Sequence, residues 1–238
     1  KPKGLTQKIL IAMAAGLVLG AILNLIGTDG FVKDYLIDGV FYVVGKVFIA
    51  SLKLLVVPLV FVSLVCGTAS LDDITKLGRV GGKTLGFYML TTAAAIVMAL
   101  IAASIVQPGA GFEMTTDANF QGKDAPPLVE TLINIFPTNP VQAMAEGKML
   151  QIIVFAGLFG LALTLSGEPG KRLLAVFNDL NEVIQKMVMM IMIIAPYGVF
   201  ALITKVFAEQ GIGAILPLGK YFLVVLGVLV LHVFIVYF

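Results

Sequence analysis

The stretch SLKLLVVPLVFVSLVCGTASLDD, from Ser51 to Asp73, decides the fold class of this chain. It is almost entirely apolar up to its acidic end, yet it contains a lysine, Lys53, and a proline, Pro58. A membrane-spanning helix needs about 20 predominantly apolar residues, and this run is long enough. Both exceptions are costly in hydrocarbon, because a charge loses its hydration and a proline removes a helical hydrogen bond. The stretch therefore predicts a membrane helix with a built-in irregularity.

The composition of the whole chain agrees with this prediction. Of the 238 residues, 59% are hydrophobic and 13% are charged, and the mean hydropathy is +1.04. Soluble domains average roughly 45–50% apolar and about 25% charged residues. The sequence thus predicts an all-α integral membrane protein. The net charge of +2 gives no indication of nucleic-acid binding, and the single cysteine, Cys66, cannot form an internal disulfide.

Six apolar runs predict the membrane spans. They are Ile9–Ile26, Val40–Leu71, Gly86–Val106, Leu150–Leu165, Val183–Phe207 and Leu216–Phe238. Lysine and arginine are more frequent before the first span and after the second and fourth, which predicts a cytoplasmic N-terminus in a multi-pass membrane protein. The second run would be about 48 Å long as a helix, against about 30 Å of hydrocarbon, so part of it should lie at the interface or run obliquely.

Two local patterns predict details of the helices. In FPTNPVQAMAEG, Asn139 is expected to cap a helix that begins at Pro140. The motifs GLVLG and GKTLG place two glycines four positions apart inside apolar runs, which predicts close helix packing. These glycines are residues 16 and 20 and residues 82 and 86.

Hydroxyl groups gather on one face of the third predicted span. In KTLGFYMLTTAAA, the side chains of Thr84, Tyr88, Thr91 and Thr92 share one side of a helix. In one interpretation each hydroxyl bonds a carbonyl of its own helix. In the other, the oxygens form part of a site for a hard cation such as Na⁺, with a carboxylate supplied from elsewhere. The residues alone leave both interpretations open.

The second span carries a polar stripe made of Gly39, Tyr42, Lys46 and Lys53, which should face protein or water. Lys53 itself has two interpretations. Its ammonium group either reaches the membrane interface along its stem or lies beside an aqueous pathway. No cluster of residues has the spacing of a metal centre, and no nucleophile has a plausible base, so neither an enzyme nor a cofactor is predicted.

Four blocks of the chain resemble the dicarboxylate/amino acid:cation symporters, the family of glutamate transporter homologues. They are LKLLVVPLVFVSLVCGTASLDD, FYMLTTAAA, FPTNPVQAMAEGKMLQIIVFAGLFGLAL and APYGVFALITKVFAEQG, in family order and spacing, and the similarity runs from about Gln7 to the last residue. The resemblance implies a secondary active symporter that takes up glutamate, aspartate or C4-dicarboxylates, coupled to Na⁺ and/or H⁺.

The resemblance also implies an architecture. It is a homotrimer whose protomers move substrate by an elevator motion. Residues 5–71 and 128–207 would form the trimerisation scaffold. Residues 82–106 and 216–238, the third and sixth spans, would belong to the transport domain.

Carried over residue by residue, the resemblance assigns a Na⁺ site to the backbone carbonyl of Tyr88 and the hydroxyls of Thr91 and Thr92. Some relatives have serine at position 92, which supplies the same kind of oxygen. Lys53 and Pro58 would lie on the scaffold helix against which the transport domain slides, with the proline bending it.

The chain departs from the family pattern at its end. Relatives continue with two re-entrant hairpins and two further spans, so the chain is expected to be an N-terminal part whose substrate-binding residues lie beyond Phe238. The alternative is a membrane-embedded oligomerisation scaffold without transport activity.

Overall fold

The computed structural model describes residues 4–27, 30–70, 74–108, 127–211, 213 and 215–236, and the regular elements in these ranges are all helices. The chain divides into two compact units. The first unit comprises residues 1–72 and 123–209, and the second comprises residues 73–122 and 210–238. These ranges enclose the predicted scaffold and transport segments. The role of each unit stays a prediction.

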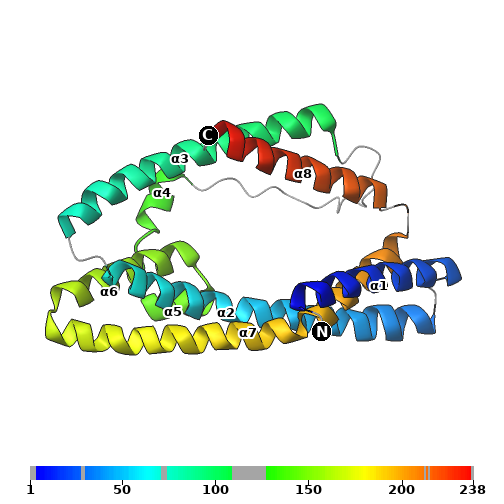
Figure 1. The fold of residues 1–238 in the computed structure, drawn as a ribbon, viewed down its shortest axis with the longest axis horizontal. Helices are drawn as coiled ribbons and strands as arrows, with labels where there is room; N and C mark the ends of the chain where they lie inside the picture. The colour runs from blue at the N-terminus through cyan, green and yellow to red at the C-terminus, as the bar shows by residue number, and fades with distance from the viewer. Residues whose placement is uncertain are drawn as a thin grey trace. The chain divides into compact units, whose positions relative to one another are not determined.

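Figure 1 shows the helices of both units. The first unit contains α1 (Leu5–Ile26), the π-helix η1 (Val32–Phe41), α2 (Tyr42–Ala69), α4 (Leu128–Ile133), α5 (Pro140–Glu146), α6 (Met149–Leu165) and α7 (Glu168–Gln210) up to residue 209. The second unit contains α3 (Ile74–Val106) and α8 (Ile215–Val236), which lie side by side and antiparallel.

Several of these helices are long and apolar enough to cross a membrane, which confirms an all-helical, multi-pass membrane protein. Within the described ranges the candidate spans number five: Leu5–Ile26, Val32–Ala69, Gly81–Val106, Glu168–Gln210 and Leu218–Val236. The predicted count of six spans is not confirmed. The fourth predicted run forms a shorter apolar helix, Met149–Leu165, of 17 residues. At about 26 Å it falls short of a hydrocarbon core of about 30 Å.

Two helices begin well before the predicted spans. Helix α3 starts at Ile74 rather than Gly86, and α7 starts at Glu168 rather than Val183. The added turns carry lysines, arginines and glutamates, which are excluded from hydrocarbon but are good helix formers. The segment between the fourth and fifth predicted spans, which begins SGEPGKR, therefore contains only a short turn before α7, in which Gly167 adopts a left-handed conformation (φ 61°). Hydropathy locates the membrane-embedded part of a helix and not its ends.

The π-helix η1 leads directly into α2 and was not predicted. The backbone N–H of Tyr42 donates to the carbonyl of Ile37, five residues earlier, which is the π-helical pattern. η1 and α2 together form one apolar segment of 38 residues, from Val32 to Ala69. The segment is even longer than the second span predicted from the sequence.

Helices α1 and α7 pack closely through the GLVLG motif. A Cβ atom added at Gly16 would lie 2.8 Å from the carbonyl oxygen of Phe200, and one at Gly20 would lie 2.6 Å from that of Thr204. One turn further, the side-chain amide of Asn24 donates to the carbonyl of Ala208 at 2.8 Å. Residues 16, 20 and 24 of α1 thus contact residues 200, 204 and 208 of α7 in the same order, so the two helices run parallel. The predicted close packing is confirmed for this motif.

The same prediction is not confirmed for GKTLG. A Cβ atom added at Gly82 or Gly86 would meet no atom of another element within 4 Å in the described part of the chain. Both glycines lie on an exposed stretch of α3. A small-residue motif allows a close approach, but it needs a second helix on that face.

Helix α2 also packs against α7 and α6. The hydroxyl of Ser63 donates to the Asn181 side chain at 3.2 Å, and Phe48, nearer the start of α2, packs on Gly198, further along α7. These two helices are therefore antiparallel. The hydroxyl of Thr164 in α6 donates to the carbonyl of Ala69 at 3.4 Å. Around it, Val65, Ala156 and Leu163 form a buried core with partly buried phenylalanines.

The predicted cap of the short helix α5 is confirmed. The side-chain oxygen of Asn139 accepts hydrogen bonds from the backbone N–H groups of Val141 (3.0 Å) and Gln142 (3.1 Å), and Pro140 is the first helical residue. The helix ends at Gly147, which has a left-handed conformation (φ 66°). Both ends of α5 are therefore fixed by local chemistry.

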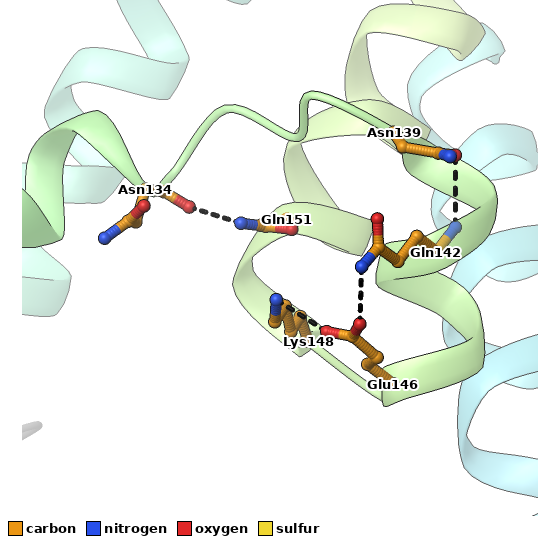
Figure 2. Close-up of polar contacts among 6 residues, drawn as sticks. All are labelled: Asn134, Asn139, Gln142, Glu146, Lys148 and Gln151. Carbon is orange, nitrogen blue, oxygen red and sulfur yellow. Dashed lines mark hydrogen bonds and ion pairs between the residues drawn. The ribbon is translucent and has the colours of Figure 1, made fainter.

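Figure 2 shows the polar contacts that join α5 to its neighbours. The Glu146 carboxylate lies 2.6 Å from the Lys148 ammonium and accepts a hydrogen bond from Gln142 at 2.7 Å. Lys148, followed by Gln142, lowers the pKa of Glu146 below its ordinary value of 4.5. The Gln151 side chain donates to the carbonyl of Asn134 at 2.9 Å and so ties α6 to the end of α4.

The packing of α1 on α7 can be tested at Gly20. We expect Gly20→Ala to destabilise the full-length protein by about 1–3 kcal/mol, because the added methyl group forces the two backbones apart. The matched control is Gly157→Ala in α6, where an added Cβ meets nothing within 4 Å. There the better helix propensity of alanine should leave stability unchanged or raise it by up to about 1 kcal/mol. Thermal unfolding in detergent measures both, and an unchanged melting temperature for Gly20→Ala would refute the contact.

Candidate cation site

The three residues of the predicted cation site lie on consecutive turns of α3, in the second unit. The Thr91 hydroxyl donates a hydrogen bond to the carbonyl oxygen of Tyr88, with 3.1 Å between the two oxygens. The side chains of Thr91 and Thr92 are half-buried, while the Tyr88 ring is 64% exposed. The ring therefore lies outside the core formed by the described residues, and the Tyr88 group that lies beside the Thr91 hydroxyl is its carbonyl.

The bond between Thr91 and Tyr88 is the intrahelical contact expected in the simpler interpretation. It joins the same two oxygens that the other interpretation assigns to Na⁺. At 3.1 Å apart, both could contact one small cation if the hydroxyl turned its hydrogen away. A hydroxyl oxygen has two lone pairs, so it can serve either as donor to the carbonyl or as ligand. Cation binding at these residues stays a prediction.

The described part of the second unit supplies only neutral ligands. Residues 74–106 and 215–236 contain neither aspartate nor glutamate. No group of three or more His, Cys, Asp or Glu side chains suited to a metal ion occurs within the described ranges of either unit. A cation bound by α3 would therefore need an acidic partner or more carbonyl oxygens from other residues.

A lysine of α8 contacts the C-terminal end of α3 within the second unit. The Lys220 ammonium of α8 donates to the carbonyl oxygen of Gln107, just past the last residue of α3, at 3.4 Å. Gln107 adopts a left-handed conformation (φ 44°) that turns the chain at this point. A cation at the C-terminus of a helix stabilises its dipole. This contact holds the beginning of α8 against the end of α3.

A polar cluster in the first unit was not predicted from the sequence. The Lys205 ammonium of α7 forms ion pairs with Asp38 of η1 and, at 3.0 Å, with Glu209. It also lies 4.7 Å from the centre of the Tyr42 ring, and Lys46 lies 5.3 Å from the same ring. Tyr42 and Lys46 of the predicted stripe thus share their face of α2 with a cation from α7. The i,i+4 spacing of Lys205 and Glu209 could have predicted their ion pair from the sequence. The ion pair with Asp38 joins residues far apart in the sequence, and no sequence pattern predicts it.

Lys53 and Pro58 both lie in α2, in the first unit. Lys53 is exposed, and no hydrogen bond or ion pair of its side chain is found among the residues that the structure describes. Helix α2 continues through Pro58, which has no N–H to donate to the carbonyl of Leu54. The structure therefore shows a weakened turn in α2. The predicted sliding role of these residues is not tested by it.

Comparison with known proteins identifies what this chain is similar to. The sequence pattern of the sodium:dicarboxylate symporter family matches residues 5–238. The chain is 36% identical over 243 residues to the proton/sodium-glutamate symport protein of Geobacillus stearothermophilus, covering 98% of this chain and 56% of that protein. It is 36% identical over 235 residues to the proton/glutamate-aspartate symporter of Escherichia coli (strain K12), covering 93% and 53%. The C4-dicarboxylate transport protein of Rhizobium leguminosarum is 33% identical over 220 residues, covering 89% and 47%.

The chain spans about half the length of the curated relatives that it matches. These relatives carry the names of transporters and not of enzymes, in agreement with the lack of predicted catalytic residues.

Proposed function

Because the chain belongs to the sodium:dicarboxylate symporter family, we propose that this protein is a secondary active symporter for acidic solutes. The substrates would be glutamate, aspartate or C4-dicarboxylates, the solutes in the names of its relatives. The coupling ion would be Na⁺ and/or H⁺. The alternative of a scaffold without transport is not favoured, because the relatives that align with nearly the whole chain are named as transporters.

The proposed ion coupling rests on one observation. On α3 the Tyr88 carbonyl and the Thr91 hydroxyl lie in contact, and Thr92 is adjacent to them. A cation bound there would favour the substrate-loaded conformation if that conformation binds the cation more tightly. By linkage, the substrate would then strengthen cation binding by the same factor. The ion gradient would drive net uptake through this mutual dependence.

The two-unit organisation supports a mechanical role for each part. The first unit would be the trimerisation scaffold of a homotrimer in the cell inner membrane, with its N-terminus in the cytoplasm. The second unit, with α3 and α8, would belong to the transport domain of an elevator mechanism. The boundaries at residues 72 and 122 fall between the two proposed groups of helices, and the boundary at residue 209 falls at the end of α7.

Ion coupling can be tested by replacing the two threonines together. We expect Thr91→Val with Thr92→Val to reduce Na⁺-driven uptake about a hundredfold or more, because each of the two lost oxygen contacts to a charge costs about 1.5–3 kcal/mol. Uptake of labelled glutamate, aspartate and succinate into proteoliposomes, with Na⁺ and pH gradients imposed separately, measures this and identifies the ion.

Two control variants accompany this experiment. Thr91→Ser with Thr92→Ser retains both hydroxyls and should retain coupling. Thr84→Val removes an exposed hydroxyl one turn before Tyr88 and should have little effect. Undiminished gradient-driven accumulation by the double valine variant would exclude the site. An absence of gradient dependence in the unmodified protein, with every acidic substrate, would exclude symport.

The proposed mechanical role of α2 is tested at Pro58. Pro58→Ala restores the missing hydrogen bond and should straighten and stiffen the helix, so we expect the transport rate to change several-fold while substrate affinity changes less than twofold. Initial uptake rates and equilibrium binding, measured on the same preparation, separate these effects. Pro196→Ala, at the internal proline of α7, is the matched control. An unchanged rate for Pro58→Ala would refute the role.

A further inference from the structure

An open, mostly apolar cavity of about 420 Å³ lies between α1 and α7, near the start of α1. It is lined by Lys8, Ile11 and Ala12 of α1 and by Ile193, Pro196 and Phe200 of α7. Its size lies within the range of small-molecule sites, about 300–1,000 Å³. Both helices belong to the first unit.

The cavity follows from the packing at Gly16 and Gly20. The hydrogen bond of Asn24 to Ala208 sets an offset of 184 residues between the two parallel helices. The same offset places Ala12 opposite Pro196, one turn before Gly16. Ala12 is too small to fill the space beside the proline, and the face of α7 there is built from residues at i, i+3 and i+7. A groove therefore opens where the tight contact of the glycines ends.

Among the described residues that line this groove, Lys8 is the one that carries a positive charge, and it marks one end. Lys8 lies near the beginning of α1, is exposed, and has no hydrogen bond or ion pair through its side chain within the described parts of the chain. The first turn of α1 contains no acidic residue, and the positive end of the helix dipole adds to the charge of the lysine. Tyr197, which also lines the groove, is 71% exposed and carries a polar hydroxyl on an apolar ring.

The depth of the groove matches the membrane. With α1 as a membrane span, as its length and composition indicate, Lys8 near its start would lie at headgroup level, and Gly16, about 12 Å further along the helix axis, would lie in hydrocarbon. Among the described lining residues the wall between them is apolar apart from the Tyr197 hydroxyl, so a free phosphate would have Lys8 as its one charged partner there. An amphiphile with a negative headgroup and a hydrocarbon chain complements both the charge and the apolar wall.

We propose that the groove between α1 and α7 binds an anionic phospholipid, with its phosphate on Lys8 and an acyl chain running past Ala12 towards Gly16. The site is separate from the candidate cation site and does not depend on the proposed transport activity. The lipid would fill the space between the two helices that the alanine leaves open, and so support the first unit.

The test is lipid binding to the full-length protein by native mass spectrometry, with phosphatidylglycerol and with phosphatidylcholine of the same acyl chains. We expect Lys8→Gln to weaken phosphatidylglycerol binding about fivefold, the effect of about 1 kcal/mol per lysine at an anionic surface, and to leave phosphatidylcholine binding unchanged. Lys8→Arg should retain the preference. Ala12→Leu, which fills the groove, should weaken binding of both lipids.

The matched control is Lys83→Gln in α3, an exposed lysine of the second unit, which should leave binding unchanged. Equal losses in Lys8→Gln and Lys83→Gln would mean that surface charge alone attracts the lipid, and would overturn the proposal. Displacement of the lipid by glycerol phosphate would overturn it in favour of a free-phosphate site. Disulfide cross-linking of Ala12→Cys between copies in native membranes would overturn it in favour of a second copy of the chain.

Discussion

The constraint on which the structure depends is that a backbone in hydrocarbon must satisfy its own hydrogen-bonding groups. This requirement explains why the regular elements in the described ranges are helices and why five of them are long and apolar. It also gives meaning to the departures from regular α-helix. They are the π-helix before Tyr42, the prolines at positions 58 and 196, and the Thr91 hydroxyl that bonds the Tyr88 carbonyl. At each of these positions a backbone N–H or carbonyl group can form a hydrogen bond with a different partner from the one it has in a regular α-helix.

Much of the fold could be predicted from the sequence because the signals were local. Five of the six apolar runs correspond to candidate spans in the described ranges, and Asn139 with Pro140 fixed the start of α5. Helix ends were predicted less well, because the charged residues that leave the membrane after Ile74 and Glu168 continue the helix in water. The two glycine motifs show the limit of local reasoning. The same spacing gives tight packing at Gly20, whereas an added Cβ at Gly86 would meet no atom within 4 Å among the described residues, because the spacing alone does not determine whether a second helix packs on that face.

The polar sites also include contacts that could be predicted from the sequence and contacts that could not. The contact between Thr91 and Tyr88 follows from helical spacing, so it could be read from the sequence. The ion pairs of Lys205 could not all be read, since Asp38 is 167 positions away and meets the lysine only through the packing of η1 and α2 on α7. The groove beside Lys8 has a similar origin, because its two walls come from the first and last helices of the first unit. Family membership supplies the functional context for oxygens whose geometry alone fits two interpretations.

The most direct measurement is the thermal stability of the full-length protein as a function of Na⁺, without substrate and at constant ionic strength with K⁺ as replacement. A ligand that binds the folded state stabilises it by about 2.7 kcal/mol at 100 times its dissociation constant. If α3 contributes to the cation site, the melting temperature rises with Na⁺ in the unmodified protein and stays flat when Thr91 and Thr92 are both valine. An equal Na⁺-dependent rise in both proteins would contradict the assignment of the coupling ion to these oxygens.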